Sequence, residues 1–237
     1  MNRGKIYLIP NTLGGETLTD IIPADVSAVT VMLQVFAVEE VRSARRLLRK
    51  MDRSFPIDEV QFIELNKRSG QEAIQKLLSI LQNGTNVGLL SEAGCPGIAD
   101  PGANLVSAAH EECIEVHPFV GPSSILLALI ASGFSGQHFS FHGYLPKERK
   151  DRVKKLKDFE GDSRRTGSTH IFMDTPFRNM NVLEDLLNDL ADTTQICIAS
   201  NLTLSDSSIR TMSVKEWREH AYDLSKKPTI FLIGKRQ

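Results

Sequence analysis

The 237-residue sequence has few cysteines, no long apolar run and no excess of charge of either sign. Its three cysteines, Cys95, Cys113 and Cys197, are far apart and odd in number, so we expect reduced thiols and no disulfide framework. No apolar stretch approaches the ~18 residues that a membrane-spanning helix needs, and the first ten residues lack the features of a signal peptide. These absences predict a cytoplasmic protein with no membrane partner.

The balance of charge also limits the possible partners. Lys and Arg number 28 and Asp and Glu 29, which gives a formal net charge of −1 at pH 7. This balance argues against a protein that coats nucleic acid over its whole surface, but it leaves room for a local basic patch. Hydrophobic residues make up 41% of the chain and charged residues 24%, which is typical of a globular protein.

Short apolar runs alternate along the chain with segments whose apolar residues recur at helical spacing. In the first half this alternation predicts a parallel sheet with helices on both faces. The second half begins with a helix at 123–132 and again alternates strands and helices, with a basic helix at 147–159 and a polar loop at 161–167. We therefore expect an α/β fold in two domains, residues 1–118 and 119–237.

The most informative motif is S-E-A-G-C-P-G-I-A-D-P-G at residues 91–102, directly after a predicted buried strand. Its three glycines and two prolines favour a tight loop whose backbone groups face a ligand, at the strand end where open α/β sheets bind ligands. Asp100 is a candidate acceptor for hydroxyl or amine groups of that ligand. The alternative is that Asp100, Pro101 and Gly102 form only a turn and a helix start.

The loop after the first strand, at residues 10–16, excludes two common nucleotide sites. It does not match G-x-G-x-x-G, and it lacks the Gly-Lys-Ser/Thr of a P-loop. A dinucleotide site and a P-loop site are therefore both disfavoured.

Several motifs in a fixed order make the chain resemble the tetrapyrrole methylase family, which are class III S-adenosylmethionine-dependent methyltransferases. Within that family it is most similar to the branch that methylates a ribose 2′-oxygen of small-subunit ribosomal RNA. The motifs are I-P-x-x-x-G after the first strand, V-E-E-V-R-S-A-R-x-L-L, the motif at 91–102, G-P-S-S at 121–124 and F-H-G-Y-L-P at 141–146.

The resemblance implies two α/β domains with S-adenosylmethionine in the cleft between them, in a homodimer. It also implies a cofactor pocket made mainly of backbone groups. The residues carried over to this pocket are Pro10, Gly14, Ser91, Glu92, Ala93, Gly94, Pro96, Gly121, Pro122, Ser123 and Ser124.

The expected reaction is direct, in-line methyl transfer without a metal, with an RNA ribose 2′-oxygen as acceptor. Aligning the acceptor and excluding water are the main requirements, and a base assists an alcohol nucleophile. Glu39 and Asp100 are the predicted catalytic residues, with Glu40 a weaker candidate. For Glu39 and Glu40 the alternative is a favourable interaction with the dipole of the helix that they begin.

Two basic clusters, at 42–53 and 147–157, bear on the acceptor. On an RNA enzyme they would bind phosphates, and the alternative is a solvated helix face with i,i+4 ion pairs. The resemblance suggests ribosomal RNA or the small ribosomal subunit as partner. The predicted substrate-binding residues are Arg42, Lys147, Arg149, Lys150 and Arg178.

The chain departs from the ribosomal branch in several places, most of them in the second half. The chain has no histidine at 64–72, Met173-Asp174 replaces Tyr-Glu, Phe177-Arg178 replaces His-Arg, and Lys227-Pro228 replaces Gly-Glu. These departures leave two alternatives open: methylation of a small, tetrapyrrole-like molecule, and a cofactor-binding module that has lost turnover.

Overall fold

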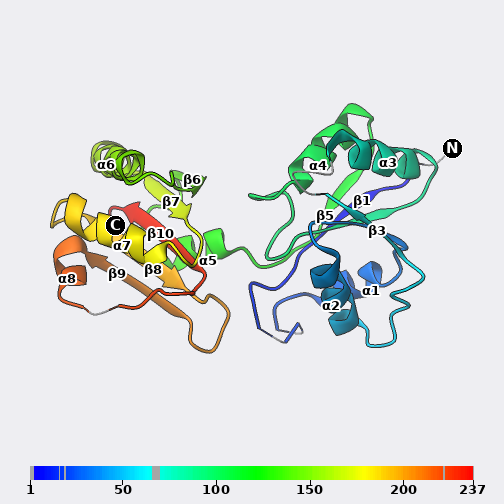
Figure 1. The fold of residues 1–237 in the computed structure, drawn as a ribbon, viewed down its shortest axis with the longest axis horizontal. Coiled ribbons are helices and arrows are strands. Elements are labelled where there is room, and N and C mark those ends of the chain that lie inside the picture. Colours follow the sequence, from blue (N-terminus) through cyan, green and yellow to red (C-terminus); the bar gives the residue numbers. More distant parts are fainter. Residues whose placement is uncertain (1–2, 16, 19, 66–69, 221, 237) are drawn as a thin grey trace. The chain divides into compact units, whose positions relative to one another are not determined.

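The computed structural model describes residues 3–15, 17–18, 20–65, 70–220 and 222–236. The chain divides into two compact units, Met1–Ser123 and Ser124–Gln237 (Figure 1). The break falls after Ser123 rather than after residue 118 because the segment in between packs on the first unit. The Phe119 N–H donates to the Leu8 carbonyl at 3.1 Å, and its ring stacks on Tyr7 with centroids 5.6 Å apart.

The first unit is an α/β unit with one five-stranded sheet. Its strands are β1 (Ile6–Ile9), β2 (Val35–Val38), β3 (Gln61–Glu64), β4 (Val87–Leu90) and β5 (Val116–Pro118). The strand order is β3-β2-β4-β1-β5, and all neighbours are parallel. The sequence pattern is therefore confirmed for this half, including the fully buried strands V-F-A-V and V-G-L-L.

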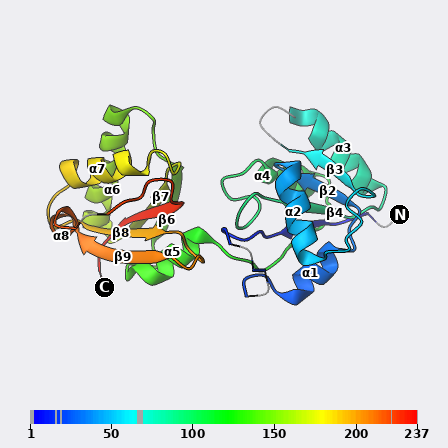
Figure 2. The same ribbon diagram turned by 60° about the horizontal axis from the view of Figure 1, so that its bottom comes forward.

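Helices cover both faces of this sheet (Figures 1 and 2). They are α1 (Ala24–Thr30), α2 (Val41–Met51), α3 (Gly70–Gln82) and α4 (Gly102–Glu111). Leu77 of α3 and Leu105 of α4 belong to one buried cluster, and Leu47 and Leu48 of α2 belong to another on the opposite face. The seven-residue helix α1 was not expected, because so short a segment shows less than two turns of periodicity.

The second unit is also α/β, but its sheet is mixed. Its strands are β6 (Phe139–Tyr144), β7 (Thr169–Met173), β8 (Gln195–Ser200), β9 (Ser208–Ser213) and β10 (Thr229–Gly234). The order is β6-β7-β10-β8-β9; β6 and β7 are parallel and the other three pairs are antiparallel. The last strand of the chain thus occupies the centre of the sheet.

The helices of the second unit are α5 (Ser124–Ser132), α6 (Arg149–Thr166), α7 (Asn179–Asp189) and α8 (Val214–Arg218). Residues 161–166 were expected to be loop, but α6 continues through them and ends at Gly167, whose φ of 74° is left-handed. The helix continues because its inner face stays buried, at Leu156, Phe159 and Ser163. Among the described residues no helix is long and apolar enough to cross a membrane.

Candidate functional site

Three loops of the first unit meet at the carboxyl edge of its sheet. They follow β4, β1 and β5, which are neighbours in the sheet. Ile9 pairs with Leu90 at the ends of β1 and β4, so residues 10–14 and residues 91–102 leave the sheet side by side. Parallel α/β sheets bind ligands at this edge, and the sequence placed its candidate cofactor residues on these same loops.

Asn11 joins the first two loops through hydrogen bonds of its backbone and its side chain. Its backbone N–H donates to the Gly94 carbonyl at 2.9 Å, and the Gly94 N–H donates back to the Asn11 carbonyl at 3.1 Å. Its buried side-chain amide donates to the carbonyls of Ser91 and Glu92, at 3.2 and 2.9 Å. The sequence analysis missed Asn11, although its position directly after a predicted strand was a usable signal.

The third loop packs closely against the other two, and at Gly121 there is no room for a side chain. A Cβ atom built on Gly121 would lie 2.1 Å from the Cβ atom of Pro10. The Cys95 Sγ atom lies 3.3 Å from the Pro122 carbonyl, and burial raises the pKa of its thiol. A raised pKa disfavours the nucleophilic thiolate, so packing explains Cys95.

The end of the second loop is shaped by Asp100. Its carboxylate accepts the N–H of Gly97 at 2.9 Å and the N–H of Gly102 at 2.7 Å, and burial raises its pKa. Ala99 has a φ of 61°, a left-handed value that is uncommon outside glycine. Asp100 therefore holds a strained turn in place and starts α4, which is the arrangement that the simpler alternative predicts.

Much of the carboxyl edge consists of backbone and small side chains, although Glu92 is exposed within the second loop. Gly97, with a φ of 83°, has open space where a Cβ atom would stand, and Ala93 is exposed while Ser91, Gly94 and Pro96 are buried beneath it. Such a surface suits a ligand that is held by N–H and C=O groups. The loops thus fit S-adenosylmethionine in the way that the motif implies.

Glu39 and Glu40 follow β2, whose last residue, Val38, pairs with Leu90 of β4. Glu39 is half-buried at the same edge as Ser91. The Glu40 carboxylate accepts the N–H groups of Arg42 and Ser43, at 3.0 and 2.7 Å, so it is the N-cap of α2. A capping role accounts for Glu40, and Glu39 is the residue that directly follows β2 at this edge.

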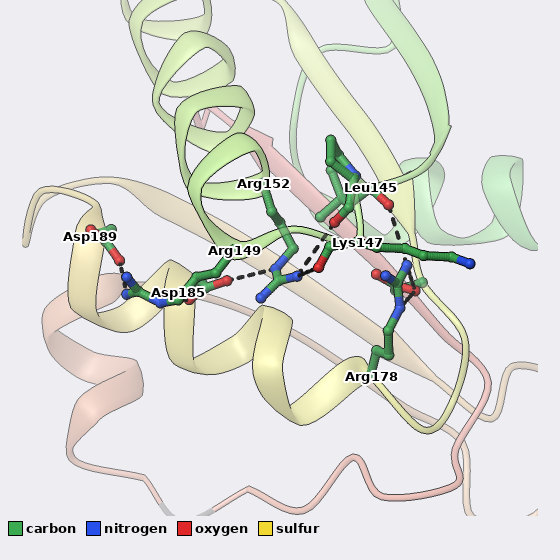
Figure 3. A network of polar contacts seen from close by, with 9 residues as sticks. Leu145, Lys147, Arg149, Arg152, Arg178, Asp185 and Asp189 are labelled. Atoms are coloured by element: carbon green, nitrogen blue, oxygen red, sulfur yellow. Dashed lines mark hydrogen bonds and ion pairs between the residues drawn. The ribbon is translucent and has the colours of Figure 1, made fainter.

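The candidate substrate residues of the second unit lie around the start of α6 and of α7 (Figure 3). Arg149 forms ion pairs with Asp185 and Asp189, at 2.9 and 2.7 Å. Arg178 donates from Nε to the buried Asp174 at 2.7 Å. Arg149 and Arg178 are thus engaged within the unit, whereas the structure describes no ion pair for the exposed side chain of Lys150.

Two polar side-chain atoms of the Asp174–Arg178 pair are buried without a hydrogen-bond partner among the described residues. The Asp174 Oδ2 and the Arg178 Nη1 have no hydrogen bond to any described residue. Lys147 joins the same region through its backbone, because its carbonyl accepts Nη1 of Arg152 at 2.8 Å. Ser124, the last of the predicted cofactor residues, is the first residue of α5.

The second unit also contains a histidine pair that the sequence analysis did not foresee. His142 on β6 and His170 on β7 hydrogen-bond through their rings at 2.9 Å, and His170 contacts Asp162 at 3.1 Å. Burial lowers the pKa of both histidines, that of His142 to about 4. The pair lies on neighbouring strands, which sequence spacing alone does not reveal.

Comparison with known proteins identifies the family of the chain. The model of the tetrapyrrole (corrin/porphyrin) methylases matches residues 24–217. Proteins named ribosomal RNA small subunit methyltransferase I are also similar. That of Vibrio cholerae is 32% identical over 211 residues, covering 89% of this chain and 69% of that protein. That of Thermotoga maritima is 31% identical over 238 residues, covering 98% and 99%.

Solved structures agree on the fold. The crystal structure of the methyltransferase CobJ has a TM-score of 0.63 and 18% identity, covering 98% of this chain and 94% of that one. The structure of the cobalt precorrin-4 methyltransferase CbiF has a TM-score of 0.62 and 16% identity, covering 97% and 94%. The predicted fold class and cofactor are confirmed, and the chain belongs to the tetrapyrrole methylase family of S-adenosylmethionine-dependent methyltransferases.

Proposed function

We propose that this methyltransferase acts on a ribose 2′-oxygen of small-subunit ribosomal RNA. The observation that carries the proposal is the likeness to small subunit methyltransferase I over nearly the full length of both chains, at 98% and 99% coverage for the Thermotoga maritima protein. A ribosomal substrate would place the reaction in the cytoplasm.

In this proposal the three loops of the carboxyl edge hold the cofactor, which supplies the methyl group as an activated sulfonium. The support is the dense packing of Asn11, Gly94 and Gly121, which fixes the backbone groups before any ligand arrives. Preorganised groups of this kind bind a ligand without the further loss of conformational entropy that ordering a mobile loop would require. We include the flanking residues Pro10, Gly14, Ser91, Glu92, Ala93, Pro96, Pro122, Ser123 and Ser124 as proposed cofactor contacts.

We propose Glu39 as the base that accepts the proton of the attacking hydroxyl. Two observations favour it over Asp100. Glu39 is half-buried at the carboxyl edge, directly after a strand that neighbours β4. Asp100 accepts the N–H groups of Gly97 and Gly102, which gives it a structural role in its own loop. We assign Asp100 the role of holding that loop.

Methyl transfer from tritiated S-adenosylmethionine tests the acceptor. The substrate is small ribosomal subunits assembled on transcribed RNA, which carries no methyl groups. We expect the label in RNA, at a nucleotide that resists alkaline cleavage because its 2′-oxygen is blocked. Label in a metabolite extract and none in RNA would overturn the proposal in favour of a small-molecule acceptor.

We also propose that the chain works as a homodimer. The support is apolar surface on the second unit, where Ile130 of α5 is 77% exposed and Phe139 of β6 is 42% exposed. Light scattering on a size-exclusion column is expected to give twice the mass of the 26.3 kDa chain. A concentration-independent monomer would contradict this.

A further inference from the structure

The exposed face of α2 carries only positive charge. The helix contains Arg42, Arg45, Arg46, Arg49 and Lys50 and no acidic residue. At about 100° per residue these five fall within roughly 140° of the helix circumference, opposite the buried Ala44, Leu47 and Leu48. Such a one-sided charge is more than solubility requires.

Most of this charge has no acidic partner. Arg45 pairs with Asp58 at 2.7 Å, at a site where both side chains are exposed. The structure describes no side-chain partner for Arg42 or Arg46, and Arg49 donates only to the Arg53 carbonyl, at 2.6 Å. The carboxylate of Glu40 is occupied at the N-cap. Arg42 and Arg46 are exposed, and the structure describes no ion pair for either of them.

The basic helix α6 differs in this respect. Arg152 is buried with Asp185, and Arg149 pairs with both Asp185 and Asp189. Lys157 adds a contact to Asp189 at 3.6 Å. Arg149, Arg152 and Lys157 thus hold α6 to α7, and α6 also carries acidic residues of its own, which α2 does not.

The position of α2 links this charge to the proposed site. The helix begins at Glu40, two residues after β2 ends, so its first turn lies at the carboxyl edge that holds the cofactor loops. A surface hollow of ≈520 Å³ runs along α2 and is lined by Arg42, Arg46 and Arg49 among others. On α2, Arg42, Arg46 and Arg49 recur at intervals of about one turn, roughly 5–6 Å apart.

We propose that this arginine face of α2, Arg42, Arg46 and Arg49, binds the phosphate backbone of the RNA substrate and guides the acceptor ribose to the carboxyl edge. Guanidinium groups suit phosphates because they form paired, charge-assisted hydrogen bonds. The face reads charge and spacing rather than bases, since no aromatic side chain interrupts it. This inference rests on the proposed RNA acceptor.

The test compares Arg46→Glu/Arg49→Glu with a control, Arg164→Glu on α6, whose side chain is 66% exposed. The measurements are KM and kcat for methylation of small ribosomal subunits assembled on transcribed RNA, and the salt dependence of binding to the transcribed RNA alone. We expect the double variant to raise KM about tenfold or more, to leave kcat unchanged, and to reduce the slope of log K against log salt by about 1.5. The control should behave as the wild type.

The outcomes separate the possible failures. An unchanged KM and salt slope in the double variant, with active wild type, would overturn the arginine face and leave the proposed function intact. A loss of subunit binding without any loss of RNA binding would also overturn it, and would assign the face to an acidic ribosomal protein. Wild type that labels no RNA would overturn the proposed function itself. Unchanged calorimetric affinity for S-adenosylmethionine shows that the variant is folded.

Discussion

The Nε2 atom of His142 lies 2.9 Å from the Nδ1 atom of His170, and the two rings stack with Phe159. Asp162 Oδ2 contacts the far nitrogen of His170 at 3.1 Å, and Lys155 also faces the group, since its Nζ lies 5.2 Å from the Phe159 ring centre. Burial, followed by the neighbouring His170, lowers the pKa of His142 to about 4. Both rings are therefore neutral in the folded chain at pH 7.

This arrangement predicts that the second unit loses stability in acid. The unfolded chain takes up a proton near pH 6.5 and the folded chain only near pH 4, so the free energy of unfolding falls as the pH drops through this interval. The fluorescence of Trp217, the single tryptophan and buried in this unit, reports the transition in urea. His142→Asn should flatten the pH dependence and His138→Asn, on an exposed histidine, should not. Equal slopes in all three proteins would contradict the assignment.

Gly121→Ala should force the loops after β1 and β5 apart, because its Cβ atom would lie 2.1 Å from that of Pro10. We expect a loss of about 1–3 kcal/mol in stability and weaker binding of S-adenosylmethionine by calorimetry. The matched control is Gly161→Ala, within α6 and with open space around it, which should add about 0.5–1 kcal/mol. A variant at Gly121 with wild-type affinity would show that the close approach is not needed.

Asp100→Ala removes the acceptor for the N–H groups of Gly97 and Gly102, whereas Asp100→Asn keeps one oxygen. We expect the alanine variant to bind S-adenosylmethionine more weakly than the asparagine variant, and both more weakly than the wild type. The measurement is the calorimetric dissociation constant. Identical affinities in all three would show that Asp100 shapes a turn without any effect on the cofactor.

Glu39→Gln should lower kcat for RNA methylation by about 10²–10⁴-fold, since the amide cannot accept the proton, and should leave the affinity for S-adenosylmethionine unchanged. Glu40→Ala is the control, because its carboxylate caps α2. That variant should lose about 1 kcal/mol of stability and keep its kcat well below the melting temperature. A wild-type kcat for Glu39→Gln would exclude Glu39 as the base.

Asp185→Ala should destabilise the second unit by about 3–5 kcal/mol, because it leaves the buried guanidinium of Arg152 without its carboxylate. Asp189→Ala removes a pair with the exposed Arg149, and we expect it to cost about 0–1 kcal/mol. Urea unfolding followed by Trp217 fluorescence compares them. Equal losses would mean that burial does not distinguish the two pairs.

The sequence was sufficient for the centre of the first sheet because β2 and β4 are buried on both faces and consist of continuous apolar runs. It was insufficient for β9, where only Ile209 and Met212 are apolar among Ser208–Ser213, and where pairing with β8 supplies the order. For the site, the glycines of the motif at 91–102 correctly predicted a loop. They could not reveal that Asn11 fastens it, because that contact joins residues some 80 positions apart.

Separation along the chain also limits what the sequence predicts about ion pairs. The two basic clusters are alike in sequence, and only the tertiary structure shows that α7 supplies Asp185 and Asp189 to one of them. It also shows that, among the described residues, the other cluster has an ion pair between Arg45 and Asp58 and an electrostatic interaction between Arg49 and Asp52. Pairing between helices is a property of the fold rather than of i,i+4 spacing.

The central position of β10 has a consequence for synthesis. The second sheet consists of β6-β7 on one side and β8-β9 on the other, and β10 alone joins the two halves. The ribosome must therefore reach Gly234 before this sheet can close, whereas the first sheet has all its strands once Pro118 is made. At 5–20 residues per second the interval is about 6–23 s. The edge of β7 is complete at Met173 and that of β8 at Ser200, so in the last part of this interval both edges lack their partner β10 and are open to chaperones.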